Sequence, residues 1–369
     1  MNSVLLLGAG KIGGAIAKLL AMTGEYDLLV ADVNREALER LGAKTRVKTV
    51  PLNVDNPESL RQAMQQRTSV ISALSYDLNT MVAKLAHEAG LSYFDLTEDV
   101  ETRRQVQQIA ESAIAGQIFM PQCGLAPGFV SIAAHQLTQQ FDKLDEVRMR
   151  VGALPQFPTN EMKYNLTWST AGLINEYGNP CEAIHDGRPV SLLPLEGLEH
   201  FSIDGVDYEA FNTSGGVGTL SQTLAGQVRS LNYKTIRYRG HREFMVFLMN
   251  ELRLNDRRAI LKDILETAIP ITLQDVVLIF CTVSGWKEGL LTQFTDARKI
   301  YHGQIEGKTW SAIQLATASS LCAVVDMHYA KQLPTQGFVR QEDVKLDQFL
   351  ANRFGKCYER GLPELPVVS

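Results

Sequence analysis

A glycine-rich turn near the N-terminus limits the fold of this chain more than any other feature of its sequence. The apolar run of residues 3–7 breaks into Gly8-Ala9-Gly10-Lys11-Ile12-Gly13, which places G-x-G-x-x-G between a strand-like segment and a helix-like one at 15–22. In this motif the first glycine permits a tight turn, the second lets the backbone approach a pyrophosphate, and the third lets the helix pack on the strand. The helix N-terminus then faces the anion. The pattern predicts a dinucleotide-binding turn, with a chance glycine turn as the alternative.

An acidic residue at the end of the next strand-like segment, 26–30, supports this prediction. Asp32 follows the motif by about 20 positions, where a carboxylate accepts hydrogen bonds from ribose hydroxyls and repels a 2′-phosphate. We therefore expect NAD as the cofactor, with NADP possible because Arg35 is close enough to meet a 2′-phosphate. The expected cofactor-binding residues are Gly8, Gly10, Lys11, Ile12, Gly13, Asp32, Asp55, Ala73, Leu74 and Ser75.

Strand-like and helix-like segments alternate through the first 120 residues. Parallel strands need crossover connections, so this alternation predicts a parallel sheet of the Rossmann type. Ligands of such sheets bind at the carboxyl ends of the strands. This grouping places Asp32, Asp55, residues 74–76 and residues 95–98 around one crevice.

The pattern changes after the glycine-rich stretch 123–128. Longer β-like stretches follow, at 146–151, 206–211, 233–238, 275–283 and 291–301, with helical segments at 245–252 and 257–267. They predict a second, α+β domain with a largely antiparallel sheet, in an α/β chain. We expect a dinucleotide-binding domain at 1–124, completed by about 310–369 through an Ala-rich helix at 310–329. Residues 125–309 would form a substrate-binding and dimerisation domain.

Composition narrows the possible partners. The chain has 369 residues, a formal net charge of −5 and 45% hydrophobic residues, and it has neither a long basic run nor the roughly 18-residue apolar run of a membrane span. The first strand-like segment leaves no room for a signal peptide, and the five cysteines are scattered. We therefore expect a cytoplasmic protein with reduced thiols that binds a small molecule and no metal, nucleic acid or membrane.

Six motifs, spread in order over nearly the whole chain, resemble the saccharopine dehydrogenase-like family. They are L-L-G-A-G-K-I-G, I-S-A-L-S-Y, C-G-L-A-P-G, K-Y-N-L-T-W-S, A-F-N-T-S-G-G and Y-K-T-I-R-Y-R-G-H. The resemblance implies an NAD(P)-dependent oxidoreductase acting on CH–NH₂ or CH–NH donors. It also implies a second domain whose sheet serves dimerisation, and hence a homodimer or a higher homo-oligomer.

Two departures from the saccharopine-forming branch bear on the substrate. Ala126 replaces an aspartate of that branch, and Ala171 stands where the branch has an arginine for the second carboxylate-bearing arm of saccharopine. An arginine side chain forks onto a carboxylate and an alanine cannot. The segments at 213–216 and 233–241 instead resemble the lysine 6-dehydrogenase branch. Enzymes of this branch oxidise the ε-amine of L-lysine with NAD. The product, allysine, cyclises to piperideine-6-carboxylate.

The candidate catalytic residues follow from the chemistry of an amine donor. Hydride leaves the carbon only when the nitrogen is a neutral amine, whereas a free ε-ammonium has a pKa of about 10.4. Asp95 ends a strand of the first domain and is our candidate to hold the ammonium and accept its proton, with a capping carboxylate as the alternative. His241 is the candidate histidine for proton transfer.

The candidate substrate-binding residues lie mainly in the second domain. Strand alternation would place Arg237, Arg239 and His241 on one face, with Arg239 the first choice for a substrate carboxylate, unless Gly240 bulges the strand. A solvated strand edge is the alternative. The family resemblance suggests Tyr76 as a further substrate contact. The other candidates are Tyr164, the hydroxyl groups of Thr213 and Ser214, which could hold a carboxylate, and the stretch Asn175-Glu176-Tyr177. For each of these residues the alternative is simple packing or a plain turn.

Three functional interpretations follow. The favoured one is lysine 6-dehydrogenase-like oxidation of an amino acid. The second keeps the family but changes the substrate to saccharopine or a carboxylated polyamine, and Ala171 speaks against saccharopine. The third is a non-enzymatic NAD(P)-sensing regulatory protein, which would bind nucleotide without turnover; the polar residues collected at Asp95, Arg237, Arg239 and His241 speak against it.

Overall fold

The chain divides into two compact units in a computed structural model that describes residues 1–45 and 47–359. The first unit contains residues 1–129 and 316–357, and the second contains residues 130–315 together with 358 and 359. The chain thus returns to the first unit near its C-terminal end. The assignment of cofactor binding to one domain and of substrate binding and dimerisation to the other stays a prediction. The last residues of the predicted dinucleotide-binding domain, 360–369, lie outside the described residues.

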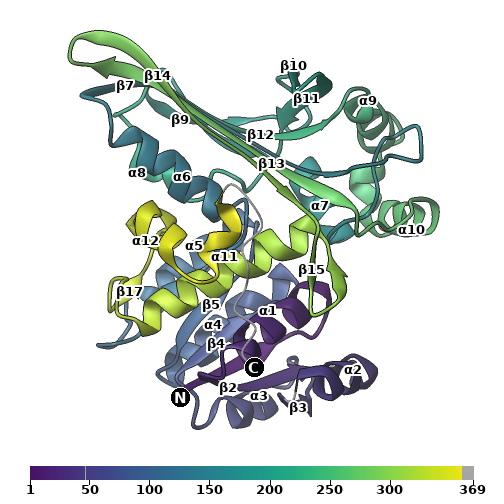
Figure 1. The fold of residues 1–369 in the computed structure, drawn as a ribbon, viewed down its shortest axis with the longest axis vertical. Coiled ribbons are helices and arrows are strands. Elements are labelled where there is room, and N and C mark those ends of the chain that lie inside the picture. The colour runs from purple at the N-terminus through teal and green to yellow at the C-terminus, as the bar shows by residue number, and fades with distance from the viewer. Residues whose placement is uncertain (46, 360–369) are drawn as a thin grey trace. The chain divides into compact units, whose positions relative to one another are not determined.

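The first unit is built on a seven-stranded parallel sheet (Figure 1). In spatial order its strands are β3 (Lys48–Pro51), β2 (Tyr26–Asp32), β1 (Asn2–Leu7), β4 (Ser69–Ser72), β5 (Ser92–Asp95), β6 (Ile118–Met120) and β17 (Gly337–Phe338). This 3-2-1-4-5-6 order reverses direction between β1 and β4, which is where doubly wound sheets bind dinucleotides. β17 adds a parallel strand from the C-terminal part of the chain.

Helices connect these strands in two groups. They are α1 (Lys11–Met22), α2 (Arg35–Thr45), α3 (Pro57–Met64), α4 (Tyr76–Glu88) and α5 (Val100–Ala110), followed in the C-terminal part by α11 (Ala312–Tyr329), α12 (Leu346–Ala351) and the 3₁₀ turns η3 (Gln341–Asp343) and η4 (Gly355–Tyr358). α1 packs beside α2, and α4 packs between α3 and α5. Right-handed crossovers produce this grouping when the strand order reverses.

The second unit is built on an eight-stranded mixed sheet. Its strands are β7 (Lys143–Pro155), β8 (Cys181–His185), β9 (Arg188–Leu192), β10 (Glu199–Ile203), β11 (Val206–Asn212), β12 (Ser230–Tyr238), β13 (Asp275–Lys287) and β14 (Leu290–Tyr301). The order β10-β11-β12-β7-β13-β14 is antiparallel except for the β12–β7 pair, and β8 joins β12 with β9 at its side. The predicted α/β fold class, with a parallel Rossmann-type sheet and a second, largely antiparallel one, is confirmed.

Smaller elements complete the second unit. They are α6 (Phe129–Thr138), α7 (Thr170–Gly178), α8 (Leu220–Thr223), α9 (His241–Val246), α10 (Arg258–Ala268), the π-helical turn η1 (Phe247–Glu251), the 3₁₀ turn η2 (Leu254–Arg257) and the hairpin of β15 (Gly303–Ile305) and β16 (Lys308–Trp310). The sequence patterns predicted neither α7 nor the strands β8 to β10. These segments are shorter than the β-like stretches that identified β7, β13 and β14.

The helix predicted at 245–252 begins earlier, at His241. Gly240 has a φ of 97°, and this left-handed conformation turns the chain from the end of β12 into α9. The buried carboxylate of Glu209 accepts hydrogen bonds from the backbone N–H groups of Gly240 and Arg242 at 2.8 and 2.6 Å. Because Glu209 lies on β11, no pattern local to the helix could reveal this cap.

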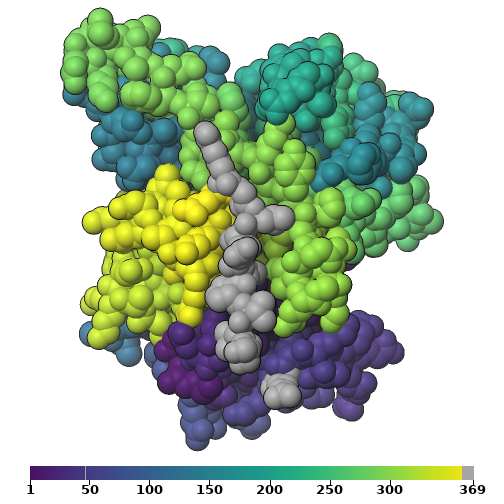
Figure 2. Space-filling model, viewed as in Figure 1, coloured from purple at the N-terminus to yellow at the C-terminus, as the bar shows by residue number. Residues whose placement is uncertain are grey.

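The turn of the β13–β14 hairpin projects from the second unit, as the light-green tip in Figure 2 shows. Leu290 and Leu291 at this turn are exposed, and β14 forms an edge of the sheet. The predicted oligomeric state stays a prediction.

Among the described residues no helix has the length and apolar character needed to cross a membrane, and no group of three or more His, Cys, Asp or Glu side chains is placed to hold a metal ion.

Candidate functional site

The glycine turn of the first unit has the geometry that its motif predicts. Gly8 has a φ of 100°, and a Cβ on Gly13 would lie 2.0 Å from the carbonyl oxygen of Gly8. A Cβ on Gly10 would meet no atom of the described residues within 4 Å. Gly8 and Gly13 are therefore required by the fold of the turn, whereas Gly10 leaves open space beside the start of α1.

The start of α1 has features that suit an anion. Gly10 is its N-cap residue and makes no side-chain cap, and the first turn contains no acidic residue. Backbone N–H groups at a helix N-terminus and the positive end of the helix dipole favour a phosphate. Lys11 and Ile12, both predicted to contact the cofactor, are the first residues of this helix. The small Gly10 and the start of this helix together fit the pyrophosphate of a dinucleotide.

Asp32 reaches back from the end of β2 to the glycine turn. Its carboxylate accepts hydrogen bonds from the backbone N–H of Ala9 at 2.6 Å and of Asn34 at 2.8 Å. These bonds hold the carboxylate beside the predicted pyrophosphate site, where an adenosine ribose would lie. Asp32 therefore fits the predicted ribose contact, and the exposed Arg35 opens α2 three residues later.

Replacing Asp32 with asparagine is expected to shift cofactor preference toward NADP. The substitution removes the negative charge that repels a 2′-phosphate but keeps an oxygen that can accept from Asn34. We expect the ratio of kcat/KM for NADP to that for NAD to rise about tenfold or more. Asp27→Asn, at the opposite end of β2, is the control and should leave the ratio unchanged. An unchanged ratio in Asp32→Asn would remove Asp32 from cofactor selection.

The remaining cofactor candidates lie at the carboxyl ends of neighbouring strands. Ala73, Leu74 and the exposed Ser75 follow β4, and the carbonyl oxygen of Ala73 would be 2.7 Å from a Cβ on Gly8. Ala73 therefore lies against the glycine turn at the point where the strand order reverses. Asp55 is exposed in the loop that follows β3. Tyr76 is half-buried at the first position of α4, directly after this loop.

Asp95 is fully buried at the end of β5. One carboxylate oxygen accepts from the backbone N–H groups of Thr97 and Gln122, both at 2.9 Å, and the other accepts from the Tyr93 hydroxyl at 2.7 Å. Burial raises the pKa of Asp95 to about 6, although these three donors oppose the rise. The geometry matches a carboxylate that ties two loops together, and the role of proton acceptor stays a prediction.

The second unit contains a buried cluster of aromatic and cationic side chains. The Arg237 guanidinium donates from Nε to the Tyr177 hydroxyl at 2.8 Å, and its carbon atom lies 5.4 Å from the centre of the Tyr164 ring. His241 Nε2 lies 3.2 Å from the same Tyr177 hydroxyl. The structure therefore brings together three predicted site residues, Arg237, Tyr164 and His241, around a fourth, Tyr177.

His241 stays neutral in this cluster. Burial and the neighbouring Arg237 lower its pKa to about 3, against a hydrogen bond with the carbonyl of Met162 that raises it. A ring that resists protonation down to this pH does not take up a proton near neutrality. Its pKa therefore argues against the predicted role of His241 in proton transfer.

The same shift predicts how stability depends on pH. An unfolded histidine takes up a proton below pH about 6.5, whereas folded His241 does so only near pH 3, so the free energy of unfolding falls as the pH drops through this window. Between pH 7 and 5 the loss is about 2 kcal/mol. Denaturant unfolding of His241→Gln should lack this part of the loss, and the exposed His185→Gln should follow the wild type. Equal pH dependence in His241→Gln and wild type would contradict a buried neutral His241.

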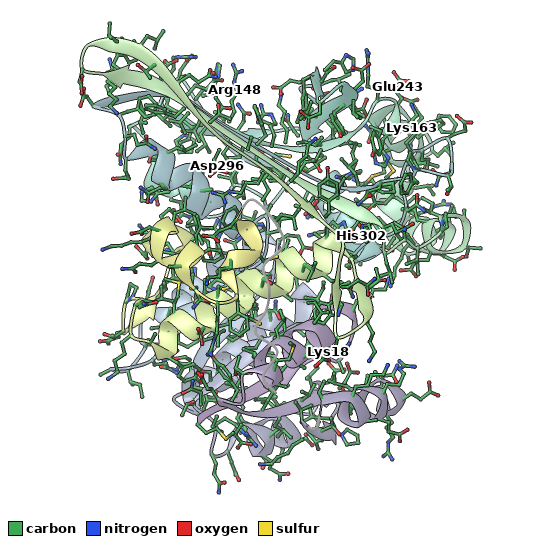
Figure 3. The ribbon with its side chains drawn as sticks, viewed as in Figure 1. Lys18, Arg148, Lys163, Glu243, Asp296 and His302 are labelled. Atoms are coloured by element: carbon green, nitrogen blue, oxygen red, sulfur yellow. The ribbon has the colours of Figure 1, made fainter. Side chains whose placement is uncertain are left out.

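Arg239 does not share the position of Arg237. Strand β12 ends at Tyr238, so the expected alternation through His241 is wrong, because the left-handed Gly240 breaks the strand. The Arg239 side chain is half exposed and forms an ion pair with Asp207 at 3.6 Å. Its carbonyl accepts from Lys163 Nζ, and Figure 3 labels Lys163 on the same side of the second unit as Glu243 of α9. The buried Arg237 therefore replaces Arg239 as the preferred candidate for carboxylate binding.

Thr213 and Ser214 follow β11 and are buried against α7. The backbone N–H of Ser214 donates to the carbonyl of Glu176 at 2.9 Å, and its hydroxyl approaches the carbonyl of Asn175 at 3.4 Å. The buried hydroxyl of Thr213 finds no hydrogen-bond partner in the described part of the chain. A buried polar atom without a partner calls for a ligand or a bound water, so Thr213 keeps its predicted role as a proposal.

Sequence patterns indicated Tyr177 only weakly as a site residue. Tyr177 lies in α7, and its two hydrogen-bond partners, Arg237 and His241, lie 60 and 64 residues away in the sequence. A signal was available in the stretch of polar residues that ends at Tyr177, but helix α7 itself was not predicted. Without that helix, no periodicity could direct the Tyr177 side chain toward Arg237.

Comparisons with known proteins assign the chain to a family. The "Saccharopine dehydrogenase NADP binding domain" matches residues 4–120, and the "Saccharopine dehydrogenase C-terminal domain" matches residues 124–356. The chain is 22% identical over 263 residues to alpha-aminoadipic semialdehyde synthase, mitochondrial, from Bos taurus, and 21% identical over 254 residues to that from Mus musculus. Each match covers 65% of this chain but only 27% of the relative, so the chain spans about a quarter of these proteins.

A solved structure shares the fold along the whole chain. The apo saccharopine dehydrogenase (L-Glu forming) from Saccharomyces cerevisiae superimposes with a TM-score of 0.77 at 16% identity, covering 97% of this chain and 96% of that one. The predicted resemblance and the predicted nicotinamide dinucleotide cofactor, NAD(P), are confirmed by the two domain matches. From these matches we conclude that the chain belongs to the saccharopine dehydrogenase family.

Proposed function

We propose that this enzyme oxidises the ε-amine of L-lysine with NAD, as a lysine 6-dehydrogenase-like member of its family. The product would be allysine, which cyclises to piperideine-6-carboxylate. The observation that supports an amino acid substrate is the buried guanidinium of Arg237 in the second unit. Asp32 supports NAD over NADP, since its carboxylate lies beside the glycine turn.

The hydrogen bonds of Arg237 leave one edge of its guanidinium for a ligand. Nε donates to Tyr177 and Nη1 to the carbonyl of Ile236, both at 2.8 Å. No hydrogen bond to another described residue uses Nη2. The pKa of Arg237 is raised; burial by itself would lower it, but Tyr177, Tyr164 and Glu176 outweigh burial. A permanently charged, oriented guanidinium among aromatic rings suits a substrate carboxylate.

The reaction requires a neutral amine, a hydride acceptor and water. When bound, the nicotinamide ring of NAD supplies the hydride acceptor. The ε-ammonium gives up a proton, the adjacent carbon gives up hydride, and water hydrolyses the resulting imine. The sum is L-lysine, NAD⁺ and water giving allysine, NADH, ammonium ion and a proton. Arg237 would hold the α-carboxylate, and Asp95 stays the proposed acceptor of the amine proton.

Saccharopine is the second candidate substrate. The solved structure that shares this fold is a saccharopine dehydrogenase (L-Glu forming), which favours saccharopine as the substrate. Against it, Ala171 occupies an exposed position in the first turn of α7 and offers no charge for a glutamate arm. A carboxylated polyamine would also meet Arg237 and needs no second cation.

The test measures NADH or NADPH formation at alkaline pH with L-lysine, saccharopine, carboxylated polyamines and cadaverine, each with NAD or NADP. We expect turnover of L-lysine with NAD and little turnover of cadaverine, which is lysine without its carboxylate. Turnover of saccharopine alone would overturn the proposed substrate. Nucleotide binding without turnover of any amine would overturn the proposed activity and favour a sensing role.

A further inference from the structure

We propose that Tyr177 and His241 are positioning residues that fix the orientation of the Arg237 guanidinium for a substrate carboxylate. The proposal rests on the proposed function, in which Arg237 binds that carboxylate. It assigns a purpose to two buried polar side chains that the proposed function leaves without a role. Both lie in the second unit, on α7 and α9.

The direction of every hydrogen bond in this chain of side chains follows from chemistry. Arg237 can only donate, so the Tyr177 oxygen accepts from its Nε. The Met162 carbonyl can only accept, so His241 carries its proton on Nδ1, which lies 3.1 Å from that carbonyl. A neutral imidazole has one N–H group, so Nε2 accepts the Tyr177 hydroxyl proton at 3.2 Å. Tyr177 and His241 each make one bond as donor and one as acceptor in this chain of side chains.

Aromatic packing holds the same arrangement from the sides. The His241 ring stacks on Phe211 with ring centres 6.4 Å apart, and it lies 5.1 Å from Tyr164. The edge of the Tyr177 ring meets Phe211 at 5.5 Å. These contacts restrict rotation of the imidazole and the phenol. A tyrosine oxygen held in this way fixes Nε of Arg237, and the planar guanidinium then has one orientation for its remaining edge.

Neutral His241 is essential to this arrangement because a protonated imidazole has no acceptor. With both ring nitrogens as donors, the Tyr177 hydroxyl would lose its partner and Arg237 would face a second positive charge. Replacing Tyr177 with phenylalanine removes the acceptor of Nε, and replacing His241 with leucine removes the acceptor of the Tyr177 proton. Glutamine at 241 offers an amide oxygen near the place of Nε2 and restores that acceptor.

The experiment compares four variants of the full-length enzyme in steady-state kinetics with its amino acid substrate. Tyr177→Phe and His241→Leu should raise KM about tenfold with kcat changed less than about twofold, because orientation of the carboxylate contributes to binding. His241→Gln should recover most of the lost affinity. Tyr238→Phe is the matched control and should resemble the wild type. Tyr238 lies on the same strand as Arg237, and this substitution removes the hydrogen bond from its hydroxyl to the carbonyl of Pro155.

Competitive inhibition by hexanoate, a carboxylate without an amine, separates this proposal from the proposed function. If Arg237→Lys changes neither KM nor hexanoate inhibition, the carboxylate site itself is wrong. If Arg237→Lys weakens both while Tyr177→Phe and His241→Leu match the control, only the positioning role is overturned. Equal losses in His241→Leu and His241→Gln would also overturn it, as would a loss in kcat alone. If His241→Leu fails to fold, the KM and kcat of Tyr177→Phe decide.

Discussion

Gly10→Val is expected to remove nucleotide binding from a chain that still folds. Within the part of the chain that the structure describes, a Cβ on Gly10 would meet no atom within 4 Å, and the φ of −68° and ψ of −164° at Gly10 are accessible to any L-residue. Branched methyl groups would instead fill the space where the backbone must approach the pyrophosphate. We expect NAD binding to weaken on the order of 100-fold, as measured by titration calorimetry.

Thermal unfolding distinguishes this loss of binding from a loss of structure. Gly10→Val should cost at most about 1 kcal/mol as a poorer helix N-cap, whereas Gly13→Ala would place a Cβ 2.0 Å from the Gly8 carbonyl oxygen and should destabilise the first unit. Gly42→Ala on α2, where the added methyl meets Thr49 at ordinary contact distance, is the control for both. Unchanged NAD affinity in Gly10→Val would place the dinucleotide elsewhere.

Arg237→Lys should raise KM for the amino acid substrate on the order of 100-fold, the second large effect. A lysine ammonium cannot donate to Tyr177 and to a carboxylate with the planar geometry of a guanidinium. Weakening a buried, hydrogen-bonded charge pair costs about 2–5 kcal/mol. Steady-state kinetics should show the loss mainly in KM, and the slow turnover of cadaverine should change little, since that diamine has no carboxylate.

Arg239→Lys is the matched control for this experiment. Arg239 is two residues away on the same chain segment, but its side chain is half exposed and pairs with Asp207. We expect KM within about twofold of the wild type, since exposed ion pairs contribute little. The opposite result, a loss in Arg239→Lys and none in Arg237→Lys, would restore the alternative that strand alternation first suggested.

Local sequence patterns predicted the first unit well because each of its signals has a local cause. The glycine turn needs a positive φ at Gly8 and close packing at Gly13, and only glycine satisfies both. Short apolar runs alternating with helical segments can only form a parallel sheet with crossovers. The end of β12 was predicted less well, since the capping carboxylate of Glu209 comes from another strand.

The candidate substrate site shows the same limit more strongly. Arg237, Tyr164 and His241 were recognised as polar or aromatic residues in family motifs, but Arg239 was preferred to Arg237. Only burial distinguishes these two arginines, and burial depends on the neighbouring strands and helices. Tyr177 had no periodic signal at all, because it belongs to a short helix whose partners lie 60 or more residues away.

The sequence by itself thus determined the cofactor-binding fold, its glycine turn and its acidic strand end, because backbone geometry and hydrophobic periodicity act over a few residues. It also indicated the family, through motifs spread along the chain. Only the tertiary structure decided which arginine is buried, how the Tyr177 hydroxyl joins Arg237 to His241, and that Asp95 has both oxygens engaged. Those outcomes depend on desolvation and on hydrogen bonds between distant segments, and neither exists until the chain has folded.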